Sequence, residues 1–438
     1  MPFIADKIFL IRIGRKSAGR AFYSFVRTKE KTNMKKKSVN ITVAIFIGLI
    51  AGVLFGLFMP GRYDFLLPVI NLITSLYMSA LKMMIYPLVF CSLIVGIKGI
   101  GSIANTGKIG GQALLYFTST TIFASILGLF LPKAMGLGKG IVIEMSEAAV
   151  EATPFTSLLD TVATLIPSNP VASFAEGNML QVLVFAIIIG ATCLAIGEKA
   201  EPFFKLAESV NDISIKIISV VMLFTPIGVF ASIASVVYAN GTDTIVALAT
   251  VLIALYVTMF LYALIVYGGI VKILGKCSVG TFFKKIMPAA LNAFGTCSSS
   301  ATIPISKKCA DDLEVPNEIS SLALPLGATI NMDAVSILMS FMIVFFANAC
   351  GVEVSFGMMV VIMLSNTLLS IGTPGVPGGA IASFAALAAI AGLPAGIMGV
   401  YISVNTLCDM GATCCNVLGD LACSVAMKET VKIDFNQK

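Results

Sequence analysis

Uncharged apolar segments about as long as a membrane-spanning helix recur along this chain. A helix needs roughly 20 apolar residues to cross the hydrocarbon core of a bilayer, and hydrophobic residues make up 58% of the sequence against 12% charged residues. In lipid, a helix satisfies its own backbone hydrogen bonds. The sequence therefore predicts an all-α polytopic membrane protein, with apolar runs at 41–61, 113–132, 178–197, 217–241, 244–271, 286–306 and 354–408.

Positive charge is concentrated before the first apolar run. Residues 1–40 hold eleven Lys and Arg against two Asp and Glu, whereas the whole chain has a net charge of +6. Segments rich in Lys and Arg stay in the cytoplasm, so we expect a basic cytoplasmic extension at 1–37 and a cytoplasmic tail at 431–438, in a multi-pass protein of the plasma (inner) membrane. A basic arm can also bind nucleic acid, but the apolar runs that follow favour a role in membrane orientation, and no nucleic-acid partner is expected.

Residue types that commonly hold transition metals are scarce. The chain has no histidine, and its ten cysteines are scattered without a CxxC pair. This composition argues against a zinc site, a haem site and a disulfide scaffold.

The run 286–306 is long enough to span a bilayer, yet basic residues lie on both sides of it. Lys284 and Lys285 precede it and Lys307 and Lys308 follow it, so both ends are expected on the cytoplasmic side. Its middle, TCSSSATIP, contains small polar residues and a proline, which is unlike a continuous apolar helix. The pattern predicts a re-entrant hairpin that enters the membrane from inside.

A second hairpin is expected in the run 354–408, which is too long for one crossing and awkward for two. Its segment SIGTPGVPGGA, at 370–380, is rich in glycine and proline. Non-helical backbone at membrane depth is tolerated only where it is buried in protein or lines a cavity. We therefore predict eight transmembrane helices plus two re-entrant hairpins, arranged as inverted repeats, which is typical of secondary transporters.

The last apolar helix carries polar residues at helical spacing. Asp409, Thr413, Asn416 and Asp420 are four, three and four residues apart and form one stripe. The two aspartates are about 16 Å apart along a helix with a 1.5 Å rise per residue, so they suggest two separate sites. A polar seam between helices is the structural alternative, although carboxylates at membrane depth are costly and usually functional.

The segment NMD contains Asn331 and Asp333, the latter being the one ionisable residue between 319 and 352. Positions two apart lie on different faces of a regular helix, so the helix should unwind here if both side chains serve one polar interior. Exposed carbonyls, carboxylates and amide oxygens are hard ligands suited to Na⁺. The alternative is that Asp333 simply bonds a neighbouring Ser or Thr.

The two expected hairpin tips add further ligand groups. Ser298, Ser299 and Ser300 offer hydroxyls and backbone N–H groups suited to a carboxylate. Glycines in the second tip allow the backbone to approach a ligand or act as a gate; they are Gly372, Gly375, Gly378 and Gly379.

In these motifs the chain resembles the dicarboxylate/amino acid:cation symporter family, which has the glutamate-transporter fold. SSSATIP, LPLGATINMD, IGTPGVPGG and DMGATCCNVLGD occur in the family's order and spacing, within a transporter domain at 38–430. The resemblance implies a homotrimer that works by an elevator mechanism. Spans 1, 2, 4 and 5 would form its scaffold, and spans 3 and 6 with residues 283–428 would form the moving transport core. The scaffold spans are expected at 41–60, 65–97, 178–197 and 207–238, and spans 3 and 6 at 112–132 and 243–271.

The resemblance also implies two to three Na⁺ sites. The first would use the side chains of Asp420 and Asn331 with backbone oxygens of Gly327 and Asn416. The second would use backbone oxygens of Thr329, Ser370, Ile371 and Thr373. The third would use Asp333, Asn331, Thr120 and Thr121. Phe117 stands where relatives place a tyrosine, so this third site would lack that tyrosine's hydroxyl.

For the substrate, the family pattern assigns the α-amino group to Asp409 and the α-carboxylate to Asn416, Ser299 and the first-hairpin backbone. Asp409 argues against dicarboxylates without an amine. The full set of expected substrate residues is Cys297, Ser298, Ser299, Ser300, Val335, Val376, Gly378, Asp409, Ala412, Thr413 and Asn416.

Charge in the expected pocket is the main departure from the family. Members with acidic substrates place an arginine at the position of Ala412 or Cys297 to hold the side-chain carboxylate, and no arginine follows Arg62 in this chain. A buried, unpaired carboxylate is costly. Together with Val335, these residues favour a sodium-coupled symporter of small neutral amino acids such as serine, alanine or threonine, with the lipid bilayer as its surroundings.

Alternative functions remain open at this point. Within the family, the chain could carry acidic amino acids or dicarboxylates, with protons in place of sodium. An ion channel is less favoured, because aspartates at transport sites indicate coupled movement. An intramembrane aspartyl protease would use two aspartates such as Asp333 and Asp420, but Val417 stands where the first glycine of its GxGD motif would be. We therefore expect no enzymatic activity.

Overall fold

A computed structural model describes residues 41–61, 64–104, 108–140 and 166–431 of the chain. Within these residues all regular secondary structure is helical, as the apolar runs predict. The expected basic extension at 1–37, almost all of the expected tail at 431–438 and the segment 141–165 lie outside the described residues.

Five helical stretches of the described chain are long and apolar enough to cross a membrane, judged by length and composition. Two of them carry the predicted aspartates, and these two are almost entirely buried inside the protein, whereas the other three expose much of their surface. Buried polar helices surrounded by apolar ones are the arrangement expected for a transport site in lipid. The five stretches are Ile109–Met135, Met179–Ala239, Ile245–Ile273, Asn317–Ala349 and Ile397–Thr430.

The first helix, α2 (Ile41–Phe58), packs closely along α10 (Thr225–Tyr262). Three glycines of α2, one turn apart, make this approach possible: a methyl group at Gly48, Gly52 or Gly56 would lie less than 3 Å from α10. Small residues at this spacing let the backbones of membrane helices come together. Helix α10 itself bends at Gly241, where φ is 68° and ψ is −155°, so it contains the turn between two predicted spans.

The predicted second span is divided rather than continuous. It consists of η1 (Asp64–Leu66), α3 (Leu67–Lys82) and α4 (Ile85–Ala104). The following helices are α5 (Lys108–Met135), α7 (Pro170–Glu176), α8 (Met179–Ile196), η2 (Gly197–Ala200), α9 (Glu201–Val221) and η3 (Met222–Phe224).

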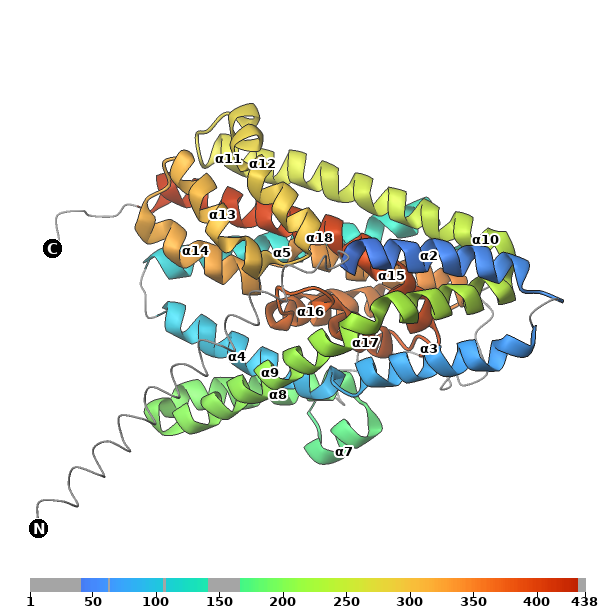
Figure 1. The fold of residues 1–438 in the computed structure, drawn as a ribbon. Helices are drawn as coiled ribbons and strands as arrows, with labels where there is room; N and C mark the ends of the chain where they lie inside the picture. Colours follow the sequence, from blue (N-terminus) through green and yellow to red (C-terminus); the bar gives the residue numbers. More distant parts are fainter. Residues whose placement is uncertain (1–40, 62–63, 105–107, 141–165, 432–438) are drawn as a thin grey trace, which may run out of the picture.

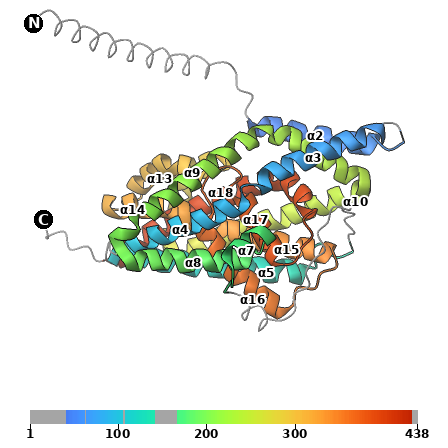
Figure 2. The same cartoon turned by 90° about the horizontal axis from the view of Figure 1, so that it is seen from below.

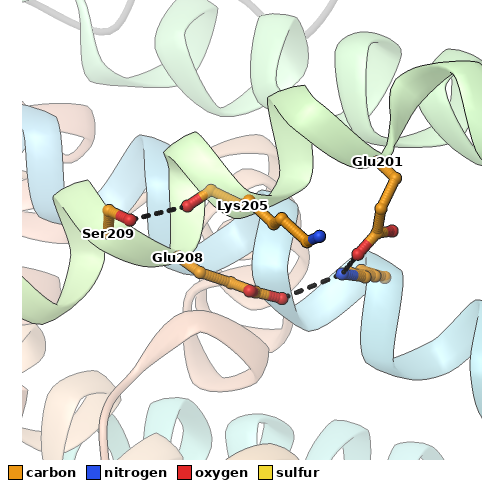
Figure 3. Close-up of polar contacts among 5 residues, drawn as sticks. Glu201, Lys205, Glu208 and Ser209 are labelled. Atoms are coloured by element: carbon orange, nitrogen blue, oxygen red, sulfur yellow. Dashed lines mark hydrogen bonds and ion pairs between the residues drawn. The ribbon is translucent and has the colours of Figure 1, made fainter. Parts of the chain in front are cut away.

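An ion-pair cluster joins α4 to α9. Glu201 and Glu208 extend from α9 toward the same point (Figure 3), where Nζ of Lys98 lies 3.0 Å from a carboxylate oxygen of each. The Lys98 ammonium also lies 5.1 Å from the ring centre of Phe204. A single lysine therefore ties two positions of α9, about two turns apart, to α4.

The C-terminal half contains both predicted hairpins as pairs of helices. The first is α12 (Val279–Thr296) and α13 (Ser299–Asp312), and the second is α16 (Phe356–Gly372) and α17 (Gly379–Ile390). Between them, α14 (Asn317–Ile330) and α15 (Asp333–Ala349) are separated by Asn331 and Met332, so the unwinding predicted at NMD is confirmed. The remaining elements are η4 (Ala263–Tyr267), α11 (Gly268–Ile273) and α18 (Ile397–Thr430).

Helix α18 lies in the interior of the molecule. Figures 1 and 2 show it, in red, among the yellow and orange hairpins and α15, with the blue and green helices α2, α3, α4, α8 and α9 toward the outside. Nearly all side chains of α18 are buried from Ile397 to Met427. The polar stripe of this helix therefore faces protein on all sides, where only specific partners can satisfy it.

Candidate substrate and cation sites

The tips of the two hairpins touch each other. The Ser298 hydroxyl donates a hydrogen bond of 3.0 Å to the Gly375 carbonyl, and the Ser300 backbone N–H donates to the same oxygen at 3.2 Å. Gly375 also fits tightly against α14, since a methyl group there would lie 2.5 Å from the Ala328 carbonyl oxygen. The tips of the two hairpins and the end of α14 thus meet at one place.

Asp409 lies beside this meeting point. Its Oδ2 atom accepts a hydrogen bond of 3.1 Å from the Gly378 backbone N–H, and its Oδ1 atom accepts one of 3.1 Å from the Thr413 hydroxyl. Gly378 has a φ of 77°, in the left-handed region that favours glycine, which aims its N–H at the carboxylate. Asp409 as a whole residue is 5% exposed. Its carboxylate oxygens keep lone pairs that can accept a further hydrogen bond.

A cavity of about 180 Å³ opens onto the Asp409 carboxylate. Asp409 is the one charged side chain among its lining residues, so the cavity is suited to a small ligand with a positive or hydrogen-bond-donating group. The lining residues are Ile45, Ser219, Met222, Thr296, Cys297, Pro377, Gly378, Asn405, Thr406 and Asp409.

Of the predicted substrate residues, the structure brings Cys297, Gly378 and Asp409 to the cavity. Thr413 reaches it only through Asp409, and the Asn416 amide oxygen instead accepts a hydrogen bond from the Ala334 backbone N–H at 2.8 Å. The others are not among its lining residues: Ser298, Ser299 and Ser300 lie in the contact with the second hairpin, Val376 lies within that hairpin's tip, and Val335 and Ala412 are buried.

Several cavity residues were missed by the sequence analysis. Asn405 is four residues before Asp409, so extending the polar stripe of α18 by one turn finds it. Ile45, Ser219 and Met222 come from α2, α9 and η3, more than 70 residues before Thr296, the first hairpin residue in the cavity lining. No local pattern marks these three as site residues.

Three of the four residues of the first predicted cation site, Gly327, Asn331 and Asp420, lie together. The Asn331 side-chain amide donates a hydrogen bond of 2.9 Å to Oδ1 of Asp420. A methyl group at Gly327 would lie 2.3 Å from the same oxygen, and the Gly327 carbonyl accepts the Asn331 backbone N–H. The break after α14 and the helix α18 thus meet at the Asp420 carboxylate, which receives the Asn331 amide N–H.

The third predicted site is also assembled, with an addition. The Thr121 hydroxyl donates to Oδ1 of Asp333 at 2.7 Å, and the Thr120 hydroxyl lies 3.5 Å from the Asn331 amide oxygen. Asp333 therefore does bond a threonine, as the structural alternative to a cation site predicts. Two tyrosines that the sequence analysis missed, Tyr262 and Tyr267, also reach Asp333, at 3.3 Å and 2.9 Å. Phe117 is fully buried and has no side-chain oxygen to contribute, although its backbone carbonyl accepts a hydrogen bond from the Thr120 hydroxyl.

The second predicted site would use backbone oxygens, and the structure gives the following contacts for its residues. The Thr373 hydroxyl contacts the Ser383 hydroxyl at 2.6 Å, and the Ser370 hydroxyl donates to the Thr367 carbonyl. The Thr329 hydroxyl donates to the Leu326 carbonyl within α14. Ile371 packs against α4, where a methyl group at Gly96 would lie 3.1 Å from its carbonyl oxygen.

The chemistry of these donors fits a hard cation. The atoms around Asp420 and Asp333 are carboxylate, amide, hydroxyl and carbonyl oxygens, which suit alkali and alkaline-earth ions rather than soft metals. Among the residues that the structure describes, no cluster of His, Cys, Asp and Glu suits a transition metal. The residues present therefore fit the sodium sites that the motifs suggest.

Comparisons with known proteins agree on one family. Residues 41–430 match the sequence profile of the sodium:dicarboxylate symporter family. A C4-dicarboxylate transport protein from Bacillus subtilis (strain 168) is 30% identical over 389 residues, which cover 87% of this chain and 91% of the relative. Proton/sodium-glutamate symport proteins from Geobacillus stearothermophilus and from Bacillus subtilis are 26% and 28% identical, over 90% of this chain and 95% and 94% of the relatives.

Proposed function

The chain belongs to the sodium:dicarboxylate symporter family, and we propose that it carries an amino-acid substrate across the membrane together with a cation. Its relatives are transport proteins, so this chain is a transporter and not an enzyme. The observation that carries the proposal is the buried Asp409 carboxylate, which faces a cavity of ligand size without a cationic partner in its lining. An α-ammonium group supplies that partner.

The names of the relatives bear on the charge of the substrate. They are C4-dicarboxylate and glutamate transporters, which supports the acidic alternative better than the neutral amino acids that the sequence favours. Glutamate is the acidic substrate that also offers Asp409 an amine. We therefore propose an acidic amino acid as the first candidate substrate.

A small neutral amino acid is the second candidate, for a specific reason. The cavity lining contains no Lys or Arg, and Cys297 and Ala412 stand where a guanidinium would pair with a side-chain carboxylate. Burying a carboxylate without a partner costs several kcal/mol, and each ~1.4 kcal/mol is a tenfold change in affinity. A lining without Lys or Arg therefore favours serine, alanine or threonine over the acidic substrates for which the relatives are named.

Uptake into liposomes separates the two candidates. The purified chain is reconstituted, an inward Na⁺ gradient is imposed, and uptake of radiolabelled L-glutamate, L-aspartate, succinate, L-serine and L-alanine is compared with a choline control. Uptake of glutamate with little serine supports the acidic class, and the reverse supports the neutral class. Asp409→Asn should abolish uptake of any amine-bearing substrate, and strong succinate uptake unaffected by this change would contradict the amine role.

Sodium is the coupled cation that the oxygen donors support best, through Asp420, Asn331 and Gly327 at one site and Asp333 with Thr120 and Thr121 at another. Some relatives are named for protons as well as sodium. Uptake driven by a pH gradient and indifferent to sodium would replace Na⁺ with H⁺ and leave the substrate site unchanged. The site of Thr329, Ser370, Ile371 and Thr373 stays a prediction.

An elevator mechanism is consistent with where the cavity lies. One side of it comes from α2, α9 and η3, which belong to the expected scaffold, and the other from the hairpin tips and α18, which belong to the expected transport core. A substrate bound between two such parts can be released on either side when one moves along the other. The homotrimer, the plasma-membrane location and the cytoplasmic termini also stay predictions.

A further inference from the structure

Two tyrosines missed by the sequence analysis surround Asp333, and a short irregularity in the helix places them there. Tyr262 ends α10 and Tyr267 ends η4, which is a single turn of π-helix. Its defining hydrogen bond runs from the Gly268 backbone N–H to the Ala263 carbonyl, five residues back. Such turns are rare and occur often at functional sites.

The π-turn decides which way the two tyrosines point. In a regular α-helix with 3.6 residues per turn, positions five apart differ in direction by about 140°. The wider π-turn brings positions five apart to nearly the same face, and both hydroxyls here reach the same atom, Oδ2 of Asp333. The rings meet edge to face, with centres 5.2 Å apart and planes at 87°. Both side chains are fully buried.

The last helix leaves room for this arrangement at Gly419. A methyl group on Gly419 would lie 2.6 Å from the Tyr267 hydroxyl and 3.0 Å from the Asn331 amide nitrogen. Glycine at this position therefore allows the Tyr267 hydroxyl to lie against α18, between the groups that form the two proposed cation sites.

Each tyrosine hydroxyl has a single proton to donate. The distances indicate that the two tyrosines donate it to different acceptors. Tyr267 donates to Asp333 at 2.9 Å. Tyr262 is closer to the Thr120 carbonyl, at 2.8 Å, than to Asp333, at 3.3 Å, so its proton goes to the carbonyl. Its oxygen then presents a lone pair beside the Asp333 carboxylate, and two such oxygens in a dry interior repel each other unless a cation binds both.

We propose that Tyr262 and Tyr267 are part of the cation site at Asp333, an inference that rests on the proposed cation coupling. Tyr267 is a positioning residue, which holds the Asp333 carboxylate by donating a hydrogen bond. Tyr262 is a cation ligand, whose hydroxyl oxygen is oriented by the Thr120 carbonyl. The π-turn η4 is the structural device that brings both to one carboxylate.

The test is the response of the purified full chain to sodium. Thermal midpoints are measured in detergent at fixed pH without substrate, while NaCl replaces choline chloride at constant ionic strength. In Tyr262→Phe and Tyr267→Phe, the Na⁺ concentration that gives half of the stabilisation should rise about tenfold, as expected when a hydrogen bond or ligand at a charged group is lost. The matched control is Tyr401→Phe, which removes a buried hydroxyl without a hydrogen-bond partner among the described residues.

Uptake in liposomes gives a second readout that a purely structural role would not move. The Na⁺ concentration for half-maximal uptake should rise in both variants, while the KM for substrate at saturating Na⁺ stays within about twofold of the wild-type value. An unchanged sodium response in both variants would overturn the inference. If the wild-type chain itself gains no stability from Na⁺, the sodium coupling of the proposed function falls, and that failure is visible without any variant.

A further variant covers the case in which Tyr267→Phe does not fold. Gly419→Ala keeps both tyrosines but displaces the Tyr267 hydroxyl through the contact of 2.6 Å. It should weaken the sodium response in the same direction, and a wild-type response would count against the role of Tyr267.

Discussion

The side-chain amide of Asn331 donates a hydrogen bond of 2.9 Å to Oδ1 of Asp420. The two residues are 89 positions apart, one in the break between α14 and α15 and the other in the middle of α18. This bond fixes where the unwound segment meets the last helix. The amide nitrogen of Asn331 serves this bond, and its amide oxygen lies 3.5 Å from the Thr120 hydroxyl, among the residues of the proposed site at Asp333.

The space beside this bond can be tested at Gly327. In Gly327→Ala, the new methyl group would lie 2.3 Å from Oδ1 of Asp420 and should displace the carboxylate. We expect a loss of about 1–3 kcal/mol in stability, as for overpacked cores, and a weaker stabilisation by Na⁺, both read from thermal midpoints of the purified chain. The control is Gly399→Ala in α18, where a methyl group meets no atom within 4 Å and should stabilise the helix by up to about 1 kcal/mol. Equal midpoints for the two variants would contradict the packing described here.

The contact between the hairpin tips predicts how accessible the cavity is. Gly375→Ala places a methyl group 2.5 Å from the Ala328 carbonyl oxygen, so the second tip can no longer close against α14. Cys297, which lines the cavity and is 6% exposed, should then react with N-ethylmaleimide at least about tenfold faster, the change that ~1.4 kcal/mol of lost closure gives. The extent of labelling at Cys297 is measured by mass spectrometry.

Gly295→Ala is the matched control for this labelling experiment. It lies in α12, close to Cys297 in the chain, and its methyl group meets no atom within 4 Å. Its labelling rate should equal that of the wild-type chain. A rate in Gly375→Ala that is also unchanged would show that the tip contact does not limit access to the cavity.

The charge of the cavity predicts a change of substrate preference in Cys297→Arg. A guanidinium at this position would lie in the cavity and could bind a side-chain carboxylate with two hydrogen bonds. We expect the ratio of glutamate uptake to serine uptake to rise about tenfold or more, since bonds to charged groups are worth ~1.5–3 kcal/mol. The control Cys297→Ser keeps a small neutral side chain and should leave the ratio unchanged. A lower ratio in Cys297→Arg would show that this position does not face the substrate side chain.

The ion pairs between α4 and α9 predict a modest, salt-dependent contribution to stability. Lys98→Gln removes the ammonium that pairs with both Glu201 and Glu208 (Figure 3). All three side chains are partly exposed, so we expect a loss of about 1 kcal/mol at low salt, shrinking at high salt because of screening. Lys205→Gln on α9 is the control, since Lys205 has no ion pair among the described residues. A salt-independent loss in Lys98→Gln would indicate lost packing against Phe204 instead.

Much of the architecture could be predicted from local patterns. The lengths of the uncharged runs identified the helical membrane fold. The lysines around 286–306 and the glycines and prolines at 370–380 identified both hairpins. The spacing of Asn331 and Asp333 identified the break between α14 and α15, because helical periodicity is a property of neighbouring residues.

The structure brings only some of the predicted substrate residues to the cavity. Cys297, Gly378 and Asp409 line the cavity, whereas Asn416 bonds the backbone of Ala334 and Ala412 is buried away from the lining. A stripe of polar residues on a helix shows that they share a face. It does not show which of several neighbouring elements each residue meets.

The sequence alone thus determined which segments enter the membrane, where the chain must break inside it, and which polar residues must find partners there. The tertiary structure decided what those partners are. Tyr262 and Tyr267 reach Asp333 from 71 and 66 residues away. Met222 lines the cavity although it is far along the chain from Cys297 and Asp409. Charge and periodicity act between neighbours along the chain, whereas these contacts depend on how the helices pack and on one π-turn that rotates a tyrosine toward its carboxylate.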